Sequence, residues 1–274
     1  MFRAPEGEKM DNTNNKKYWN DYVTYWENRV KETNNGKEVK DKTSDDGILE
    51  KYYKKLDVKS EDIFLDYGCG SGRLYSIYKK ELETGGNYVG VDVSSVCLAH
   101  AEHENEDLKV GDNLKEFDGI YIPYDNDSFD KIICFGVFDA CNQELVIREL
   151  FRVLKTGGLL LITGKNHQYY EDDEKAYVAE VNARKKGHPN YFTDVRNLTL
   201  QLKEHGVQLN ETCFFLRRGD FPNDKMTLKM PKIFYEWAYL LEKTADYKDY
   251  EYRKFSDMYS KNGREWRNKE GNCF

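Results

Sequence analysis

Residues 63–92 combine glycines and acids at a spacing that suits an adenosine-containing ligand. The stretch reads IFLDYGCGSGRLYSIYKKELETGGNYVGVD, in which two apolar runs end at acids and flank a glycine-rich turn and a helical segment. Gly68, Gly70 and Gly72 allow a sharp turn and a close approach of the backbone to a ligand. Asp92 follows at roughly the 20-residue offset at which an acid meets ribose hydroxyls. The spacing predicts a strand, a nucleotide-type loop, a helix and a parallel strand, but no particular reaction.

Arg73 distinguishes this turn from the fingerprint of dinucleotide-binding proteins. That fingerprint, G-x-G-x-x-G/A, needs a small residue where this chain has Arg73, so that the helix can pack on the strand. The turn also lacks the GK[ST] ending of a phosphate-binding P-loop. An NAD-dependent oxidoreductase is an alternative class, and it would have to bind NAD despite Arg73.

The elements that position this loop follow from hydrophobic periodicity and from turn residues. We predict further helices over residues 17–30, 45–55, 95–104, 142–154, 172–186, 194–204 and 233–241, and further strands over 108–111, 131–135, 159–163, 207–216 and 250–259. The alternation of strands and helices predicts a parallel sheet with helices on both faces. Ligands bind such sheets beyond the carboxyl ends of the strands, which is where the glycine-rich turn lies.

Four further motifs follow the glycine-rich turn in order. They read VGVDVS at 89–94, VGDN at 110–113, PYDNDSFDKI at 123–132 and LFRVLKTGGLLLITGKN at 150–166. Together with D-x-G-x-G-x-G at 66–72, they resemble the class I S-adenosylmethionine-dependent methyltransferases. The resemblance implies a Rossmann-like, seven-stranded, mostly parallel sheet with helices on both faces, plus a helical N-terminal cap. It also implies S-adenosyl-L-methionine as the methyl donor and S-adenosyl-L-homocysteine as the product.

The resemblance also implies a set of cofactor contacts. Asp92 would accept hydrogen bonds from both ribose hydroxyls, and Asp112 would accept one from the adenine amino group. Asp112 could instead be only a turn acid, and Cys134 only a core thiol. The implied contacts are Asp66, Gly68, Gly70 and Gly72 at the methionine portion, Asp92 at the ribose, Val93, Asp112 and Asn113 at the adenine, and Cys134, Phe135 and Gly136 near the sulfonium.

Asp139 and His167 are the candidate catalytic residues. Many members of the family place a His shortly after the fourth strand, where this chain reads VFDAC at 137–141, so a role there passes to Asp139. His167 follows the fifth strand, and its unperturbed pKa of ~6.5 suits a general base at neutral pH. A solvated loop histidine is the alternative. A hydroxyl acceptor would benefit from a base, whereas an amine need only be neutral.

Two segments outside the sheet could cover the acceptor. The helix over 17–30 carries tyrosines at i, i+4 and i+7, so its aromatic face could pack on the domain, close over a cleft, or both. Residues 167–190 form a long excursion after a strand end, a common location of substrate sites. We therefore divide the chain into an N-terminal helical cap or lid at 1–57 and a methyltransferase domain at 58–274, with 167–190 as an acceptor-side excursion.

Composition indicates the class of partner. The formal net charge is -7, so no global basic field is present to hold nucleic acid, and no apolar run approaches the ~18 residues of a membrane span. We expect transfer to an oxygen or nitrogen of a small molecule. Basic residues at 184–186 and 217–218 could favour an anionic or sugar-linked metabolite, although a solvated charge run is the commoner explanation. The oligomeric state stays open.

The six cysteines have no CxxC spacing and no local histidine partner, so no metal site is predicted. Their irregular spacing indicates reduced thiols, and residues 1–10 lack the apolar core of a secretory leader. We therefore expect a cytoplasmic protein. A module that binds the cofactor or a partner without transferring methyl is a further alternative, because the His after the fourth strand is missing.

Overall fold

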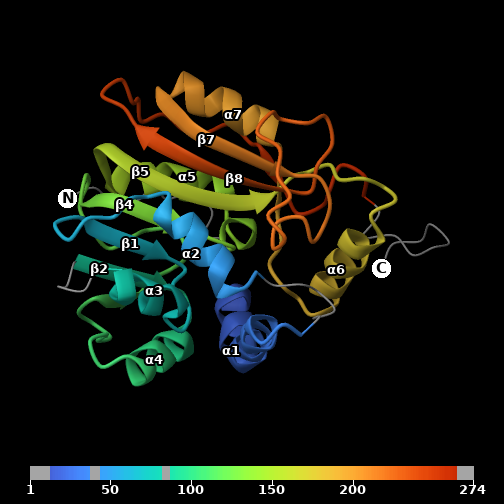
Figure 1. Cartoon of the computed structure of the whole chain (residues 1–274). Coiled ribbons are helices and arrows are strands. Elements are labelled where there is room, and N and C mark those ends of the chain that lie inside the picture. The colour runs from blue at the N-terminus through green and yellow to red at the C-terminus, as the bar shows by residue number, and fades with distance from the viewer. Residues whose placement is uncertain (1–12, 38–43, 82–86, 264–274) are drawn as a thin grey trace.

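The main sheet has seven strands. It lies at the centre of the molecule, as Figure 1 shows. The computed structural model describes residues 13–37, 44–81 and 87–263. The strand order is β3-β2-β1-β4-β5-β8-β7. These strands are β1 (Ile63–Tyr67), β2 (Asn87–Asp92), β3 (Leu114–Glu116), β4 (Phe129–Cys134), β5 (Leu154–Lys165), β7 (Val207–Phe215) and β8 (Glu236–Lys243). A separate two-stranded sheet pairs β6 (Phe192–Thr193) with β9 (Ser256–Asp257).

The first five strands pair in parallel, and β8 runs antiparallel to both β5 and β7. The order β3-β2-β1-β4-β5 changes direction between β1 and β4, so the loops that leave these strands diverge at their carboxyl ends. Such a switch point is the usual ligand site of open α/β sheets. The glycine-rich turn leaves β1 at this point.

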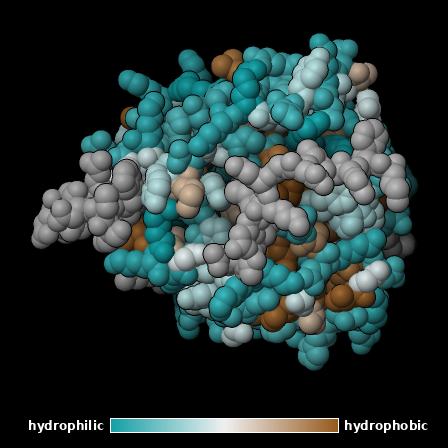
Figure 2. Space-filling view, turned by 180° about the vertical axis from the view of Figure 1, so that it is seen from behind, coloured by the Kyte–Doolittle hydropathy of each residue, from teal (hydrophilic) through white to brown (hydrophobic). Residues whose placement is uncertain are grey.

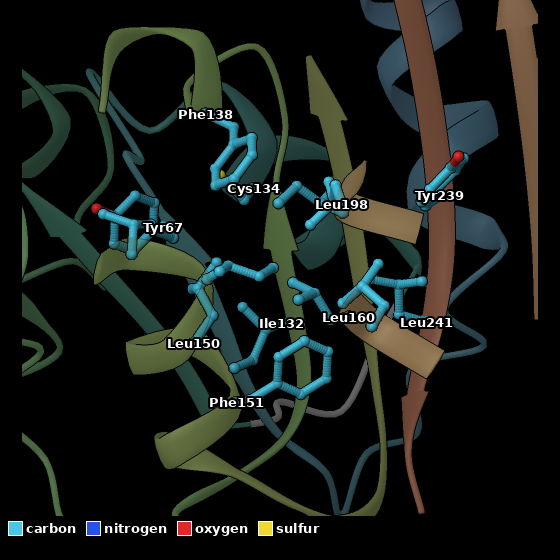
Figure 3. Packing of buried hydrophobic residues seen from close by; sticks show 14 of the residues in the cluster. Tyr67, Ile132, Cys134, Phe138, Leu150, Phe151, Leu160, Leu198, Tyr239 and Leu241 are labelled. Atoms are coloured by element: carbon cyan, nitrogen blue, oxygen red, sulfur yellow. The ribbon is translucent and has the colours of Figure 1, made fainter. Parts of the chain in front are cut away.

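Helices cover both faces of the sheet. Those on one face are α2 (Asp46–Lys54), α3 (Arg73–Glu81) and α4 (Ser95–Glu104), and those on the other are α5 (Gln143–Val153) and α7 (Val195–Glu204). Successive residues of a strand point to opposite faces, so Phe64 packs with α2 and α3 while Leu65 belongs to the core cluster on the other face, which includes residues of α5 and α7. Figure 3 shows the second cluster, in which Ile132 and Leu160 meet Phe151. The predicted seven-stranded, mostly parallel sheet with helices on both faces is confirmed.

The predicted helix over 233–241 is wrong, because these residues belong largely to strand β8. Trp237 and Leu241 pack against the face that carries α5 and α7, while Ala238 packs against the opposite face. β8 pairs with β5 on one side and with β7 on the other. A strand buried on both faces has few polar residues to reveal a period of two, so periodicity cannot separate it from a buried helix.

The predicted third strand over 108–111 is also misplaced. β3 starts at Leu114, and only Val110 of the predicted range forms an isolated bridge. The turn before the strand is closed by the Asn113 side chain, whose Oδ1 accepts a hydrogen bond from the Lys109 N–H (2.7 Å). The predicted last strand over 250–259 reduces to the two residues of β9, outside the main sheet.

Two helices lie beyond the carboxyl ends of the parallel strands. They are α1 (Thr13–Asn34) and α6 (Glu174–Lys185), and Figure 1 shows both on that side of the sheet. α1 contacts α4, where Glu27 Oε1 lies 3.1 Å from His100 Nδ1. Residues 1–12 of the predicted cap lie outside the described residues.

The face in Figure 2 is mostly hydrophilic, with hydrophobic residues in separate groups. Among the described helices, none is long and apolar enough to cross a membrane. The described cysteines are free and buried; they are Cys69, Cys97, Cys134, Cys141 and Cys213. Cys273 lies outside the described residues.

Candidate active site

A cavity of about 630 Å³ lies at the carboxyl ends of the parallel strands, a volume typical of small-molecule sites. Its lining falls into two parts, which we name by their residues. The glycine-loop compartment is lined by Asp66, Gly68, Gly70, Asp92, Val93 and Phe117. The charged compartment is lined by Trp19, Trp26, Asp139, Lys165, His188, Arg218 and Glu236.

The turn after β1 forms the wall of the glycine-loop compartment. Gly68 and Gly70 have φ angles of +76° and +54°, a region that residues with a Cβ rarely adopt. A Cβ on Gly68 would lie 2.6 Å from the Val137 side chain, whereas a Cβ on Gly70 would meet no atom within 4 Å. Gly70 therefore borders open space, in which a ligand can approach the backbone.

Asp92 ends β2 and presents its carboxylate to the cavity. Oδ2 accepts a hydrogen bond from the Gly70 N–H (2.9 Å), and Oδ1 accepts one from the Ser94 N–H (2.8 Å). Burial raises the pKa of Asp92, and backbone hydrogen bonds from Ser94, Gly70 and Val93 oppose this. A carboxylate can accept about four hydrogen bonds, so it keeps the capacity to bind a pair of hydroxyls.

Asp66 and Gly72 support the turn from opposite sides. The Asp66 carboxylate accepts a hydrogen bond from the Tyr88 hydroxyl (2.8 Å), and burial raises its pKa to about 7. Gly72 does not line the cavity. A Cβ there would lie 3.3 Å from that of Ala101, so Gly72 permits close packing on α4.

Asp112 and Asn113 do not reach the cavity. Both precede β3, Asp112 is exposed, and the Asn113 amide donates to the Asp107 carbonyl (3.0 Å). The carboxyl end of β3 leads instead to Phe117, which lines the cavity together with Val93. Sequence reasoning missed Phe117 because it placed the third strand too early.

Of the three predicted contacts at the end of β4, only two line the cavity. Cys134 is fully buried in the core near Phe138, as Figure 3 shows, and does not line the cavity. Phe135 and Gly136 do line it. The Gly136 N–H donates to Thr163 Oγ1 (2.8 Å), which fixes the loop against β5. This geometry favours the core-thiol interpretation of Cys134.

Lys165, at the end of β5, organises the charged compartment. Its Nζ lies 3.0 Å from Asp139 Oδ2 and 3.2 Å from Glu180 Oε1, and it donates to Asn190 Oδ1 (2.9 Å). Burial disfavours the ammonium, yet the carboxylates of Glu180 and Asp139 raise the Lys165 pKa overall. Lys165 is therefore a cation, and Asp139 on the short helix η1 (Phe138–Ala140) is its ion-pair partner.

Glu180 of α6 extends this network toward β8. It accepts hydrogen bonds from the Tyr235 hydroxyl and the Asn190 amide, and Arg218 Nη1 donates to the Tyr235 oxygen (2.9 Å). Despite burial, the Lys165 charge and the Tyr235 hydrogen bond lower the Glu180 pKa. Residues from β5, α6 and the loops beside β8 are thus tied together by buried charges.

Aromatic side chains of α1 meet His188 at the rim of the charged compartment. The ring centroid of His188 lies 5.0 Å from that of Tyr18, 5.3 Å from that of Trp19 and 5.9 Å from that of Trp26. Burial, assisted by the Lys165 charge, lowers the His188 pKa to about 4, so the ring is neutral. The aromatic face predicted for the helix over 17–30 therefore meets the 167–190 segment.

His167 does not line the cavity. The backbone N–H of His167 donates to the Thr193 carbonyl (2.7 Å), and the ring Nδ1 lies 3.7 Å from an Asp194 carboxylate oxygen. Burial lowers the His167 pKa. The structure therefore brings Asp139 to the cavity but leaves the other candidate catalytic residue outside it.

Glu236, like Lys165, is a charged residue at the cavity that sequence reasoning did not single out. It pairs in register with Lys165 at the start of β8, and its Oε2 atom is buried without a hydrogen-bond partner among the described residues. The sequence predicted a helix over 233–241, and a helix gave no reason to place Glu236 at the site. Strand β8 instead places this side chain beside the end of β5. Within the described residues, no group of three or more His, Cys, Asp or Glu side chains could hold a metal ion.

Comparisons with known proteins agree with this architecture. A family model described as a methyltransferase domain matches residues 58–212. A demethylmenaquinone methyltransferase from Lactobacillus johnsonii is 35% identical over 115 residues, which are 41% of this chain and 47% of that protein. The chain thus spans about half the length of such a relative.

Solved structures share the fold at low sequence identity. A SAM-dependent methyltransferase from Thermotoga maritima aligns with a TM-score of 0.57 and 15% identity, covering 84% of this chain and 99% of that chain. Geranyl diphosphate C-methyltransferase from Streptomyces coelicolor, in a complex containing S-adenosyl-L-homocysteine, aligns with a TM-score of 0.57 and 14% identity, over 73% and 76% of the two chains. Because the family model covers more than half of the chain, this protein belongs to the class I S-adenosylmethionine-dependent methyltransferases.

Proposed function

We propose that this protein transfers the methyl group of S-adenosylmethionine to an oxygen or nitrogen atom of a small molecule held in the charged compartment. One observation carries the proposal: the glycine-rich turn and the Asp92 carboxylate border the same cavity as Asp139, Lys165 and Glu236. A donor and an acceptor held in one cavity can meet without crossing solvent. The relatives support methyl transfer as the reaction class.

The residues of the glycine-loop compartment fit the cofactor. Asp92 has spare acceptor capacity for two ribose hydroxyls, and Val93 and Phe117 offer apolar surface to the adenine. The open space at Gly70 suits the amino-acid portion. When bound, S-adenosylmethionine supplies a methyl group already activated by its sulfonium. Asp112 and Asn113 lie away from the cavity, so we replace them with Phe117 as the adenine contact.

The chain contributes mainly by positioning and by excluding water. Alignment of two reactants can lower a barrier by ~7 to 11 kcal/mol. Trp19 and Trp26 place aromatic surface over the charged compartment. We therefore propose that residues 1–57 are a cap that covers the acceptor, on a methyltransferase domain at 58–274, with 167–190 completing the acceptor side.

The charges at the cavity support a neutral acceptor rather than an anionic one. Among the basic residues that suggested an anion, Arg217 pairs with Asp172 at the surface and Lys186 donates to the Tyr25 hydroxyl (2.6 Å). Arg218 lines the cavity, where Glu236 also lies. The buried free thiols support a reducing, cytoplasmic location.

Calorimetry with S-adenosylmethionine, S-adenosylhomocysteine and NAD, followed by a methyl-transfer screen over small molecules, tests this function. We expect both sulfur ligands to bind and NAD not to bind. A ligand at 100 times its Kd stabilises the protein by ~2.7 kcal/mol, so thermal shift gives a second readout. Binding of NAD without S-adenosylhomocysteine would favour the oxidoreductase alternative. Binding of the sulfur ligands without any transfer would favour the non-catalytic module.

A further inference from the structure

Glu236 has a buried carboxylate oxygen with no partner among the described residues. Its Oε2 is inaccessible to solvent and makes no hydrogen bond there, although the side chain lines the cavity. A buried carboxylate oxygen without a donor is costly, and native structures rarely keep one without a reason. A donor supplied by a bound molecule would remove that cost.

The charged groups near Glu236 come from four neighbouring elements. They are Lys165 on β5, Arg218 after β7, Asp139 on η1 and Glu180 on α6. Burial raises the Glu236 pKa to about 7; the two cations lower it, and Asp139 and Glu180 raise it. Lys165 is already engaged by Asp139 and Glu180, and Arg218 by the Tyr235 hydroxyl. Glu236 is thus the carboxylate of this group that still needs a donor.

Ring surfaces also border the same compartment. Trp19, Trp26 and His188 all line the cavity and contact one another through their rings. Such surfaces stack favourably on a planar ring. The compartment therefore combines an aromatic wall with one carboxylate that lacks a hydrogen-bond donor.

Resting on the proposed function, we propose that the acceptor is a small neutral phenol-type compound and that Glu236 accepts its hydroxyl proton. The hydroxyl donates to the carboxylate of Glu236, whose side chain lines the cavity, while the phenol ring lies against Trp19, Trp26 and His188. As the oxygen–methyl bond forms, the sulfur–methyl bond breaks and its electron pair stays on sulfur. The hydroxyl proton passes to Glu236, so charge and atoms balance.

The carboxylate favours a phenol over two other acceptors. Beside Glu236 and Asp139, an alkyl amine would be held in its protonated form, which has no lone pair for the methyl group. An aliphatic hydroxyl is far less acidic than a carboxylic acid. The pKa of a phenol is ~10, so a phenol is much closer in acidity to the carboxyl of Glu236 than an aliphatic hydroxyl is.

The test offers matched ring compounds to the protein loaded with S-adenosylhomocysteine: catechol, benzylamine and benzoate. Tryptophan fluorescence and calorimetry report binding without turnover. We expect catechol to bind at least ~10-fold more tightly than benzoate, whose anion would lie beside the Glu236 carboxylate, whereas benzylamine would bind as a cation that cannot accept the methyl group. With S-adenosylmethionine, mass spectrometry and NMR should find the methyl group on a catechol oxygen.

Glu236→Gln keeps the size of the side chain and removes the base. We expect catechol turnover to fall by ~10²-fold or more, with S-adenosylhomocysteine affinity unchanged. For the wild type, kcat/KM should rise with pH through about 7, and this limb should vanish in the variant. Glu242→Gln, at the far end of β8, is the matched control and should behave as wild type.

Several outcomes would overturn the proposal while leaving the proposed function intact. They are preference for benzoate, methylation of benzylamine rather than catechol, binding of S-adenosylhomocysteine with no ring compound bound, and a Glu236→Gln variant that keeps the pH limb. Methylation of catechol on carbon would contradict the proposed function as well. Failure of the wild type to bind S-adenosylhomocysteine would instead contradict the proposed function itself.

Discussion

The two compartments of the cavity are built in different ways. The glycine-loop compartment consists of residues at or just after the carboxyl ends of β1, β2 and β3, close to those strands in sequence. The charged compartment is assembled from α1, η1, β5, the segment after α6 and β8, which lie far apart in the chain. The first depends on local conformation, and the second on ion pairs between distant segments. A substitution should therefore damage one compartment and spare the other.

Lys165→Met should produce the largest effect, on folding stability. The substitution leaves the buried carboxylate of Glu180 without its cation, a change that typically costs about 3 to 5 kcal/mol. Urea unfolding measures the loss. Lys155→Met is the control on the same strand. The ion pair of Lys155 with Asp130 is partly exposed, so losing it should lower the free energy of unfolding by about 1 kcal/mol or less. Equal losses in the two variants would show that the buried network does not hold the charged compartment together.

Asp92→Ala should weaken S-adenosylhomocysteine binding by roughly tenfold or more, because a hydrogen bond to a charged group is worth ~1.5 to 3 kcal/mol. Calorimetry measures the affinity. Asp112→Ala is the matched control, since Asp112 is exposed and outside the cavity, and it should bind normally. If Asp112→Ala weakened binding as much as Asp92→Ala, the adenine would lie at the turn before β3, as the sequence motif suggested.

Asp66→Asn should change how stability depends on pH. Burial raises the Asp66 pKa to about 7, above its unfolded value, so ionising this group destabilises the folded state as pH rises from about 4 to about 7. The variant keeps an acceptor for the Tyr88 hydroxyl and loses this penalty. Relative to wild type, it should gain about 2 kcal/mol between about pH 5 and pH 8, measured by urea unfolding. A difference that is the same at both pH values would contradict the raised pKa.

His167→Ala should have the smallest effect. His167 was a candidate base from its position after β5, but it contacts Thr193 and Asp194 and does not line the cavity. We expect turnover within about twofold of wild type, because the residue can act only through its neighbours. Steady-state assays check this on the acceptor found by the screen. A loss of about 100-fold would return His167 to the role of base.

What could be predicted from the sequence follows the same division. The sheet, the turn at Gly68 and Gly70, and Asp92 could be predicted because a local pattern of glycines and acids specifies a local geometry. The predicted strand that ended at Asp112 was misplaced because the short strand β3 has little periodic signal and the turn at Asn113 shifts its start.

Glu236 could not be predicted for a different reason. Its neighbour Lys165 is distant in sequence, and the two meet only because β8 inserts antiparallel between β5 and β7. The apolar residues of β8 satisfy a helical and a strand pattern equally well. The aromatic face on α1 was visible in the sequence, but its partner His188 was not, because tertiary packing alone brings them together.

A crystal structure of the S-adenosylhomocysteine complex would show whether donor and acceptor occupy separate compartments. We predict both ribose hydroxyls within hydrogen-bond distance of Asp92, the adenine beside Val93 and Phe117, and the sulfur facing the charged compartment. An adenine at Asp112, or a ligand that fills the space beside Glu236, would contradict this prediction.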